Sequence, residues 1–392
     1  MHNKKYLVDI YHNILWSKYK GGVFSCLNDL SLNKDIDLHF YQIAETSAER
    51  IGLSAVDLTY HRYPYTLLFD GDYDSIPTLK LCYTLFNQTF FSKADLVLLP
   101  GYHYLEYWFM LLACIITGKK RAVFVDSTRN DRPVSNFKDA FKRIFFSLNH
   151  GFFCYGQRSK EYLISLGAPA AKIIFRCQAS ALPHNYDLED TIRNRTQRNS
   201  MRIAPSYLYV GRLSPEKGLD TLIYAFQRIF QTTPTATLTM VGSGPSRPEL
   251  EALIASLGIT DAVRFTGGLD INQLPDYYLN ASCMVLPSRS EPWGLVANEA
   301  LSYGCPIIIS DRCGCAPDLV IDGKTGYVFK TDDVEDLYQK MRLTQDKLAN
   351  TTTAANNCIK VIQNFTPAKA ASQIMDGCQA ILSATGVKDS RS

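Results

Sequence analysis

The sequence predicts an α/β protein built from two doubly wound domains, each with a parallel sheet. Three observations support this prediction: the length of 392 residues, the alternation of short apolar segments with longer amphipathic ones, and a charged segment near the middle of the chain. A length of this order is usual for two domains. Regular alternation of strands and helices is typical of parallel sheets, whose ligands bind at the carboxyl ends of the strands.

The first half of the chain contains seven segments that we expect to form strands. They are residues 6–10, 37–43, 65–69, 95–99, 122–125, 152–155 and 173–175. Gly21 and Gly22 follow the first strand, and we expect them in a loop before a helix over residues 24–30. Glycines in such a loop let the backbone approach a ligand closely. We assign residues 1–184 to an N-terminal Rossmann-like domain.

The second half repeats this organisation after a change in composition. Residues 185–204 are rich in charges and lack regular apolar spacing, so we expect a linker between the domains. Residues 205–365 are assigned to a second Rossmann-like domain. Its expected strands are residues 207–210, 237–241, 263–265, 283–286, 306–309 and 327–329. Residues 366–392 are expected to form a helix that crosses back to the first domain, followed by a tail.

Charge and cysteine content narrow the function classes. The net charge of +3 is too small to indicate nucleic-acid binding, and no recognition motif for a nucleic acid is present. The chain has 11 Cys, and Met1 to Lys5 lead into a short mixed segment instead of the apolar run of a signal peptide. We therefore expect free thiols and a cytoplasmic protein. Cys313 and Cys315 lack a second pair or a His at ligand spacing, so we expect no metal there.

Two segments raise the question of a membrane. Residues 104–117 are the most apolar segment, but they include Glu106 and are too short to span a bilayer, so we expect a buried helix. Residues 137–148 place apolar side chains on one helical face and three cations elsewhere. A helix that faces the core and a basic helix on a membrane surface share this pattern. We expect the former and leave open a peripheral contact with the inner face of a membrane.

Asp70 and Asp72 flank Gly71 directly after a predicted strand. A D-x-D pair holds a metal–diphosphate in one class of sugar transferase, but the same residues are common in turns. We expect a turn here and no metal site.

Three glycine-containing loops follow strands of the second domain. The first carries Arg212 and Lys217, two cations five residues apart. A pair of fixed cations can stabilise a leaving diphosphate as its charge develops. The second loop contains Gly242 and Gly244, and the third contains Gly267 and Gly268. In a parallel sheet these loops lie at one edge, so we expect them to form one site.

A fourth segment, residues 288–301, combines carboxylates with a helix start. Glu291 is expected in the loop after the strand 283–286, and Glu299 about two turns into the following helix. Between them, Trp293, Gly294, Leu295 and Val296 offer backbone N–H groups that the first helical turn leaves unsatisfied. Such a helix start attracts a phosphate, whereas carboxylates bind hydroxyl groups. A nucleotide-sugar carries both kinds of group.

The order of these motifs closely resembles glycosyltransferase family 4. The shared sequences are G-R-L-x-x-x-K-G, G-S-G-P, F-T-G, L-P-x-x-Y, E-P-x-G-L-x-x-x-E-A, G-C-P and G-x-x-x-P-D, between residues 207 and 329. The two glutamates with seven residues between them are the most specific feature. The resemblance implies a retaining enzyme of the GT-B fold, in which two Rossmann-like domains face each other across a cleft.

The resemblance also implies roles for the individual residues. Arg212 and Lys217 would bind the diphosphate of the donor, and Glu291 would lie beside the donor sugar. Glu299 would bind the ribose hydroxyls, and the amides around residues 294–296 would contact sugar or phosphate. One departure is Cys315, which stands where the family often has Gly. Its thiol would either narrow the donor pocket or pack.

The first half resembles the family more loosely, as acceptor domains do. Gly21 and Gly22 correspond to a loop that closes over the diphosphate. Tyr102 and the segment 126–131 resemble a subset of the family and imply contacts of Tyr102, Asp126 and Ser127 with acceptor or sugar. Many members have a His where this chain has Asp126.

The expected function is therefore metal-independent transfer of a hexosyl group, with retention, from a nucleoside-diphosphate sugar to a hydroxyl acceptor. UDP is the expected nucleotide, no further cofactor is expected, and the acceptor would be a sugar, a lipid-linked sugar or a small molecule. Such a reaction belongs to polysaccharide or glycoconjugate biosynthesis. Two alternatives remain: another GT-B enzyme, such as a nucleotide-sugar epimerase or a phosphorylase, and a non-catalytic nucleotide-sugar-binding protein.

Overall fold

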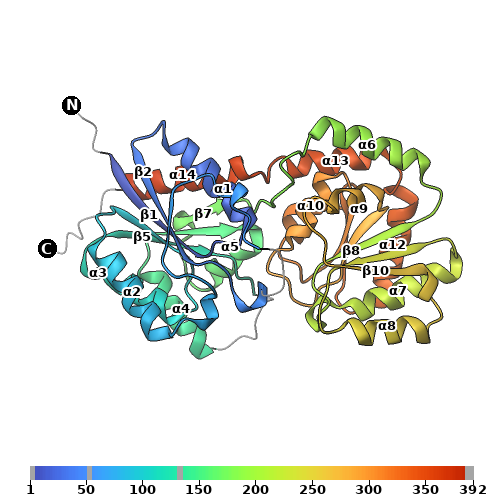
Figure 1. The fold of residues 1–392 in the computed structure, drawn as a ribbon, viewed down its shortest axis with the longest axis horizontal. Coiled ribbons are helices and arrows are strands. Elements are labelled where there is room, and N and C mark those ends of the chain that lie inside the picture. Colours follow the sequence, from blue (N-terminus) through green and yellow to red (C-terminus); the bar gives the residue numbers. More distant parts are fainter. Residues whose placement is uncertain (1–4, 51–54, 130–135, 385–392) are drawn as a thin grey trace. The chain divides into compact units, whose positions relative to one another are not determined.

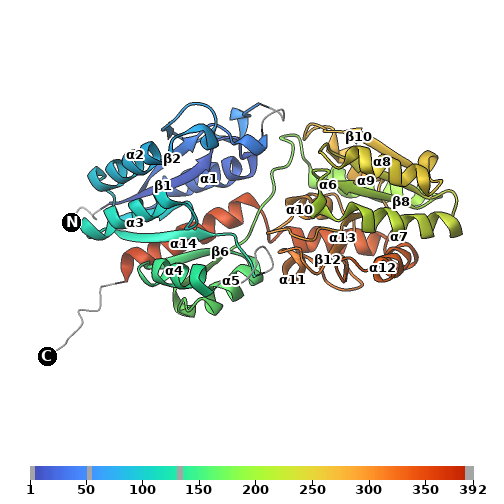
Figure 2. The same cartoon turned by 90° about the horizontal axis from the view of Figure 1, so that it is seen from below.

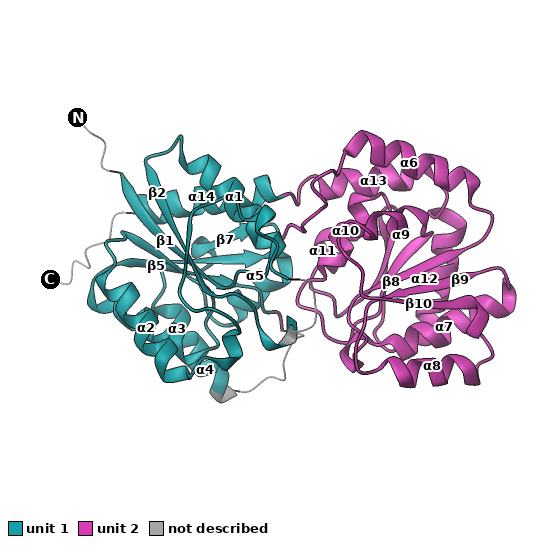
Figure 3. Cartoon of the chain, in the orientation of Figure 1, with its two compact units in different colours: residues 1–127, 133–177, 367–392 teal, residues 128–132, 178–366 magenta. Residues whose placement is uncertain are grey.

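The computed structural model describes residues 5–50, 55–129 and 136–384 (Figures 1 and 2). The chain divides into two compact units (Figure 3). Unit 1 contains residues 1–127, 133–177 and 367–392, and unit 2 contains residues 128–132 and 178–366. Each unit has its own parallel sheet, so each can be described by itself.

Unit 1 is built on a seven-stranded parallel sheet in the order β3-β2-β1-β4-β5-β6-β7. The strands are β1 (Tyr6–Ile14), β2 (Ile36–Ala44), β3 (Tyr65–Leu67), β4 (Leu96–Leu99), β5 (Lys120–Val125), β6 (Gly151–Tyr155) and β7 (Ile173–Arg176). In the central strands Val8 of β1 is in register with Leu38 of β2 and with Leu96 of β4. Every residue of β4 is buried, as its continuous apolar sequence requires in a sheet that is covered on both faces.

Helices cover both faces of this sheet (Figures 1 and 2). On one face α1 (Lys18–Ser31) packs along α14 (Pro367–Ser383). The other face carries α2 (Thr78–Phe91), α3 (Leu105–Ile116), α4 (Asn136–Ser147) and α5 (Gly156–Ser165). Short 3₁₀ helices complete the unit: η1 (Ala48–Arg50), η2 (Leu58–Tyr60), η3 (Tyr73–Ser75) and η4 (Ala170–Lys172).

Unit 2 has a six-stranded parallel sheet in the order β10-β9-β8-β11-β12-β13. Its strands are β8 (Ser206–Val210), β9 (Thr237–Val241), β10 (Val263–Gly267), β11 (Cys283–Leu286), β12 (Ile307–Ser310) and β13 (Gly326–Phe329). Its helices are α6 (Leu188–Met201), η5 (Pro215–Lys217), α7 (Leu219–Thr232), α8 (Arg247–Ser256), η6 (Thr260–Ala262), α9 (Leu274–Asn280), α10 (Leu295–Ser302), α11 (Ala316–Leu319), α12 (Val334–Lys347) and α13 (Thr352–Ile362). The strand order reverses between β8 and β11, and a ligand binds at such a switch point in doubly wound sheets.

The predicted α/β class with two doubly wound domains is confirmed, and the thirteen predicted strand segments all form strands. The first connection differs from the prediction. Strand β1 continues to Ile14 and α1 begins at Lys18, so Gly21 and Gly22 lie inside the helix and not in a loop.

The predicted linker over residues 185–204 also differs, because most of it forms α6 within unit 2. Asp187 caps this helix by accepting a hydrogen bond from the N–H of Asp190 at 2.8 Å. The buried Arg195 anchors it, since Nη1 donates to the carbonyl oxygens of Tyr278, Leu279 and Ala281 at 3.0, 3.0 and 2.7 Å. Because the buried anchor of α6 is an arginine, the sequence of this helix has no apolar stripe. The apolar spacing therefore did not predict a helix here.

The apolar segment 104–117 forms α3, but the prediction of a buried helix is wrong for one of its faces. Met110 and Leu111 are buried against the sheet, whereas Leu105, Phe109 and Leu112 are exposed. Among the described residues, no helix has both the length and the apolar content that a membrane span needs.

Candidate functional site

The candidate site of unit 2 lies at the carboxyl ends of its strands, where β8 and β11 meet. Lys217 ends η5 after β8, and Glu291 lies in the loop after β11. Lys217 Nζ donates to Glu291 Oε2 at 2.7 Å, and the two side chains are only 13% and 16% exposed. The loops of the two strands at the switch point are therefore joined by a nearly buried ion pair. An ammonium group has three donors, so two remain for an anionic ligand.

Arg212 shares the loop after β8 with Lys217, and its position is set by local hydrogen bonds. Tyr209 Oη donates to the carbonyl oxygen of Arg212 at 2.6 Å. Arg212 Nη2 lies 3.3 Å from Glu216 Oε1, which also accepts from Ser214 Oγ at 2.6 Å. The Arg212 side chain is about half exposed, so it is accessible to a ligand.

Gly242 and Gly244 hold the loop after β9 tightly against the loop after β8. A Cβ atom on Gly242 would overlap the carbonyl oxygen of Gly211, and one on Gly244 would overlap that of Leu213. The N–H of Leu213 donates to the carbonyl of Ser243 at 2.9 Å. These glycines therefore allow two loops to pack without space for a side chain.

Gly267 differs from these two glycines. It has φ +76° at the end of β10, and a Cβ atom there would meet no atom within 4 Å. Its carbonyl oxygen accepts from the N–H of Gly242 at 2.8 Å. The open space beside Gly267 fits the predicted contact with a ligand, which stays a prediction.

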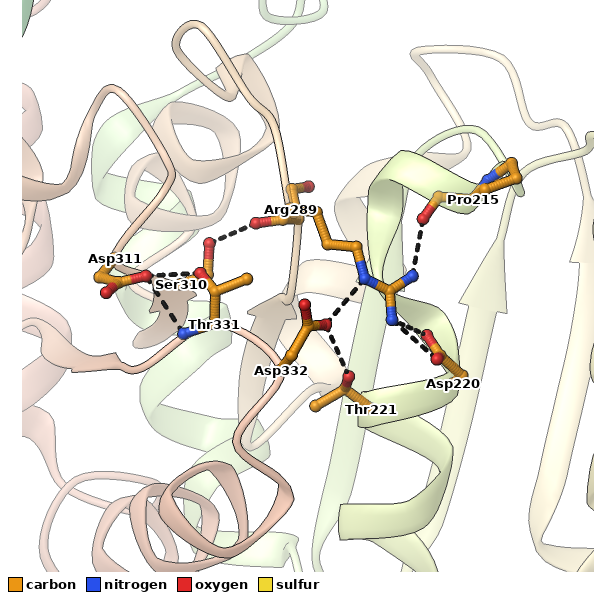
Figure 4. Close-up of polar contacts among 9 residues, drawn as sticks. Pro215, Asp220, Thr221, Arg289, Ser310, Asp311, Thr331 and Asp332 are labelled. Atoms are coloured by element: carbon orange, nitrogen blue, oxygen red, sulfur yellow. Dashed lines mark hydrogen bonds and ion pairs between the residues drawn. The ribbon is translucent and has the colours of Figure 1, made fainter. Parts of the chain in front are cut away.

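Arg289 connects the loop after β11 to three neighbouring segments (Figure 4). Its Nη2 donates to both carboxylate oxygens of Asp220 at 2.8 and 2.7 Å, and its Nη1 donates to the carbonyl of Pro215 at 2.9 Å. Its Nε donates to Asp332 Oδ1 at 2.7 Å. The hydrogen bonds to Asp220 raise the pKa of Arg289 above its usual value. Arg289 thus fixes η5, and with it Lys217, relative to the loop that carries Glu291.

The same two loops also touch through their backbones. The N–H of Arg289 donates to the carbonyl of Glu216 at 2.8 Å. Gly218 has φ +61°, and a Cβ atom there would overlap the carbonyl oxygen of Pro287. Contacts of this kind leave little freedom for Lys217 to move away from Glu291.

The helix α10 begins at Leu295, four residues after Glu291. Gly294 precedes its first residue with φ +98°, a conformation that glycine adopts without strain. The N–H of Ala297 donates to the carbonyl of Gly294 at 2.9 Å, whereas those of Leu295 and Val296 have no acceptor within the helix. Their partial positive charge makes this end of α10 a favourable place for a phosphate.

The backbone of Trp293 lies at the start of this helix, whereas its side chain packs in the interior of unit 2. Trp293 is buried, and its Nε1 donates to Asn298 Oδ1 at 2.7 Å. Cys315 is also fully buried, with its Sγ 3.6 Å from the Cβ position of Gly294. Of the two roles considered for this thiol, the structure supports packing behind the loop. Cys313 and Cys315 are both free thiols.

Glu299 lies just over one turn into α10, and not two turns as expected. Its Oε2 accepts a hydrogen bond from Tyr278 Oη at 2.8 Å. Burial raises the pKa of the Glu299 carboxyl to about 7, although the bond from Tyr278 lowers it. The side chain is half-buried and lines a small hollow with Ile271, Leu274 and Tyr303.

Of the predicted site residues of unit 1, the two glycines lie in the helix α1. Gly21 is packed in the first turn of α1, where a Cβ atom would come within 2.9 Å of His61 and of the Tyr60 carbonyl. Gly22 has open space except for Pro367 at 3.8 Å. No ligand role of these two glycines follows from their position in a helix.

Tyr102, Asp126 and Ser127 lie near the end of β5. The Tyr102 ring is buried, its hydroxyl bonds to Ser127, and burial raises the pKa of Tyr102 well above its usual value. Asp126 is exposed at the carboxyl end of the strand. Asp131, which belongs to the same predicted segment, lies outside the described residues.

The Asp70-Gly-Asp72 segment forms the expected turn. Gly71 has φ +79°, and its carbonyl accepts from the N–H groups of Glu45 and Thr46 at 3.1 Å each. Asp72 Oδ1 caps η3 by accepting from the N–H of Asp74 at 3.1 Å. Within the part of the chain that the structure describes, no cluster of three or more His, Cys, Asp or Glu side chains could hold a metal ion.

Two residues of unit 2 with evident positions in the site were not singled out from the sequence. Arg289 stands inside the motif segment, two residues before Glu291. The presence of an arginine in this segment was the feature of the sequence that could have identified it. Tyr278 belongs to the L-P-x-x-Y motif, and the structure gives that tyrosine a partner in Glu299.

Comparison with known proteins supports the sequence motifs. Residues 190–357 match the family described as glycosyl transferases group 1, and this whole match lies in unit 2. The sulfoquinovosyl transferase of Arabidopsis thaliana is 34% identical over 159 residues, which are 38% of this chain and 29% of that protein. The glycogen synthase of Mycobacterium tuberculosis H37Rv is 39% identical over 139 residues, which are 36% of this chain and 33% of that protein. The matched part thus spans about a third of each relative.

Solved structures extend the likeness to both units. HepE of Anabaena, solved in complex with UDP, has a TM-score of 0.70 at 19% identity and covers 96% of this chain and 100% of its own. Sucrose-phosphate synthase of Thermosynechococcus elongatus has a TM-score of 0.70 at 20% identity, with 97% and 100% covered. A glycosyltransferase of Rickettsia africae has a TM-score of 0.73 at 15% identity, again with 97% and 100% covered. These likenesses show the GT-B fold, and the group 1 match adds a glycosyltransferase sequence for unit 2.

Proposed function

We propose that this protein is a retaining glycosyltransferase of family 4 that moves a hexosyl group from a nucleoside-diphosphate sugar to a hydroxyl acceptor. The observation that carries the proposal is the Lys217–Glu291 ion pair at 2.7 Å, located at the switch point of the unit 2 sheet. The paired side chains stand between the loop of Arg212 and the start of α10. Cations, helix amides and carboxylates thereby meet at one sheet edge, which suits a ligand with both phosphates and hydroxyls.

In the proposed reaction the bond between the anomeric carbon and the diphosphate oxygen breaks, and a bond from the acceptor oxygen to the same carbon forms. Negative charge develops on the departing diphosphate. Lys217, Arg212 and the first-turn amides of α10 stabilise it, because donors fixed in advance need no reorganisation as charge develops. The acceptor proton moves to the diphosphate oxygen on the same face of the sugar. These protein cations would allow the reaction to run without a divalent metal.

Glu291 and Glu299 have different tasks in this proposal. Glu291 holds the ammonium of Lys217 and lies beside the donor sugar. Glu299 accepts hydrogen bonds from the ribose hydroxyls, and Tyr278 orients its carboxylate through the 2.8 Å bond. UDP is the proposed nucleotide, and HepE of Anabaena, which has a similar fold, has been solved in complex with UDP-glucose.

Unit 1 is proposed to bind the acceptor through Tyr102, Asp126 and Ser127. The acceptor would be a sugar, a lipid-linked sugar or a small molecule, and the protein would act in the cytoplasm.

The test has two steps. Thermal unfolding is first measured with UDP, GDP and ADP, because a ligand that binds the native state raises Tm. The matching nucleotide-sugars are then incubated with acceptor mixtures in the presence of a chelator, and products are analysed by mass spectrometry and anomeric NMR. We expect a product with the anomeric configuration of the donor. An epimerised or phosphorolysed sugar without acceptor product, or tight donor binding without any turnover, would instead support one of the two alternatives.

A further inference from the structure

One face of unit 1 exposes an unusual number of large apolar side chains. We call it the α2–α4 face and define it by Leu79 and Tyr83 of α2, Phe109, Leu112 and Ile116 of α3, and Ile144 of α4. These three helices lie side by side over one face of the sheet, and Figure 2 looks onto this layer. Helices α2 and α3 pack against each other, and the Trp108 ring of α3 lies 5.0 Å from the Phe145 ring of α4.

The exposure on this face is regular and large. In α3, Leu105, Phe109, Leu112 and Ile116 follow one another at helical spacing, and Ile116 is 58% exposed. In α2, Leu79 and Tyr83 are one turn apart and are 80% and 72% exposed. Single exposed apolar residues are ordinary, whereas a contiguous apolar surface marks a site of interaction. The side of α3 that faces the sheet is buried as well, so this helix is apolar almost all round.

The three helices carry four cations and two acidic residues. Their two acidic residues are Glu106 and Asp139. Glu106 is buried and accepts a hydrogen bond from Tyr73, and Asp139 pairs with Lys142 at 2.9 Å. Lys80, Lys138 and Arg143 are exposed. The face therefore combines protruding apolar side chains with cations whose charge no acidic side chain of the same helices offsets.

We propose that the α2–α4 face docks on an anionic lipid surface. Apolar side chains would enter the boundary between headgroups and acyl chains, and the long cations at the margin would bind anionic headgroups. The lengths of the three helices, 14, 12 and 12 residues, suit binding in the plane of a membrane and not across it. A second copy of the chain fits less well, because a twofold dimer through this face would place its own cations against each other.

The test is co-sedimentation of the full chain with vesicles of phosphatidylcholine, alone or with about one-third phosphatidylglycerol. We expect binding to the anionic vesicles only, and weaker binding at high salt. The double variant Lys138→Gln/Arg143→Gln should bind roughly 25-fold more weakly, at about fivefold per cation. The double variant Leu112→Gln/Ile116→Gln should lose about tenfold or more.

The matched control is Leu32→Gln/Lys34→Gln, which removes one exposed apolar residue and one exposed cation at the end of α1, over the other face of the sheet. This variant should bind as the unchanged protein does. All substituted side chains are exposed, and circular dichroism and Tm confirm that each variant folds. No binding to any vesicle, equal binding to neutral vesicles, or a dimer that only Leu112→Gln/Ile116→Gln disrupts would overturn the proposal. None of these measurements depends on transfer activity, so they leave the proposed function untouched.

Discussion

The segments that follow β8 in unit 2 and β1 in unit 1 look alike in sequence but differ in structure. Each contains two glycines and at least one lysine. After β8, Gly218 has φ +61° and the loop brings Lys217 to 2.7 Å from Glu291 on a neighbouring strand's loop. After β1, Gly21 and Gly22 are ordinary helical residues of α1. Glycines that follow a strand thus belong to a loop in unit 2 and to a helix in unit 1.

The largest expected effect concerns the converging loops. Lys217→Ala should lower kcat by about 10²- to 10³-fold, because a fixed donor to the departing diphosphate is lost. The variant also leaves Glu291, which is 16% exposed, without its ion-pair partner, so we expect a lower free energy of unfolding. Steady-state kinetics and denaturant unfolding measure the two effects.

The double variant Lys217→Ala/Glu291→Gln separates them. It removes both charges and should recover most of the stability without recovering kcat. If turnover returned together with stability, Lys217 would have a structural role alone.

The second prediction concerns Arg289, which we expect to act by positioning. Arg289→Met should lower kcat by about 10- to 100-fold with a smaller change in KM, because η5 and Lys217 lose their connection to the loop of Glu291. Arg289→Lys should recover little, since one ammonium cannot replace a guanidinium that bonds two carboxylates and a carbonyl.

Arg228→Met provides the matched control for Arg289. Arg228 of α7 also forms an ion pair, with Glu335, and its side chain is 38% exposed against 35% for Arg289. Equal losses in the two variants would mean that any lost surface ion pair weakens the enzyme and that Arg289 has no special position.

The third prediction uses the raised pKa of Glu299. Its carboxyl titrates at about 7 in the folded protein against the ordinary 4.5, so the folded state holds its proton more tightly. The contribution of this group to folding is therefore fully present below pH 4.5 and is lost as the pH rises through 7. Glu299→Gln should stabilise the protein at pH 8 by up to about 3 kcal/mol, at about 1.4 kcal/mol per pKa unit, and should have little effect at pH 4.

Ligand binding should show the opposite dependence on pH. Two ribose hydroxyls need the ionised carboxylate as acceptor, so the affinity for the nucleoside should rise about tenfold from pH 6 to pH 8. Tyr278 Oη is the polar group that bonds to this carboxylate, and Tyr278→Phe should shift the rise to higher pH. Calorimetric titration at each pH measures this, and a Glu299→Gln variant with the same pH profile would remove the ribose assignment.

The smallest expected effects are at the glycines of α1. Gly22→Ala should stabilise the protein by about 0.5–1 kcal/mol, because alanine is the better helix residue and only Pro367 lies near its Cβ. Gly21→Ala should destabilise it by about 1–3 kcal/mol, since its Cβ would press on the backbone carbonyl of Tyr60. Thermal unfolding distinguishes the two. A loss of donor affinity in the stable Gly22→Ala variant would support the predicted ligand role of Gly22.

Much of the fold follows from the sequence because several strands, such as β4, β8 and β11, are short and largely apolar runs followed directly by glycine or proline. The position of the site also follows, because parallel strands bring their carboxyl ends to one edge. The sequence does not show that Lys217 and Glu291 pair, since they are 74 residues apart and their contact depends on how both loops turn. It does not show α6 either, because the buried Arg195 holds that helix through backbone carbonyls.

The most direct test of the account measures whether Lys217 binds the diphosphate. Affinities for the nucleoside diphosphate that raises Tm most and for its nucleoside are measured by calorimetry, with the unchanged protein and with Lys217→Ala at one ionic strength. We predict that the diphosphate affinity falls by about tenfold or more, as expected when a charge-assisted hydrogen bond is lost, while the nucleoside affinity stays the same. Equal diphosphate affinities in the two folded proteins would contradict the central claim.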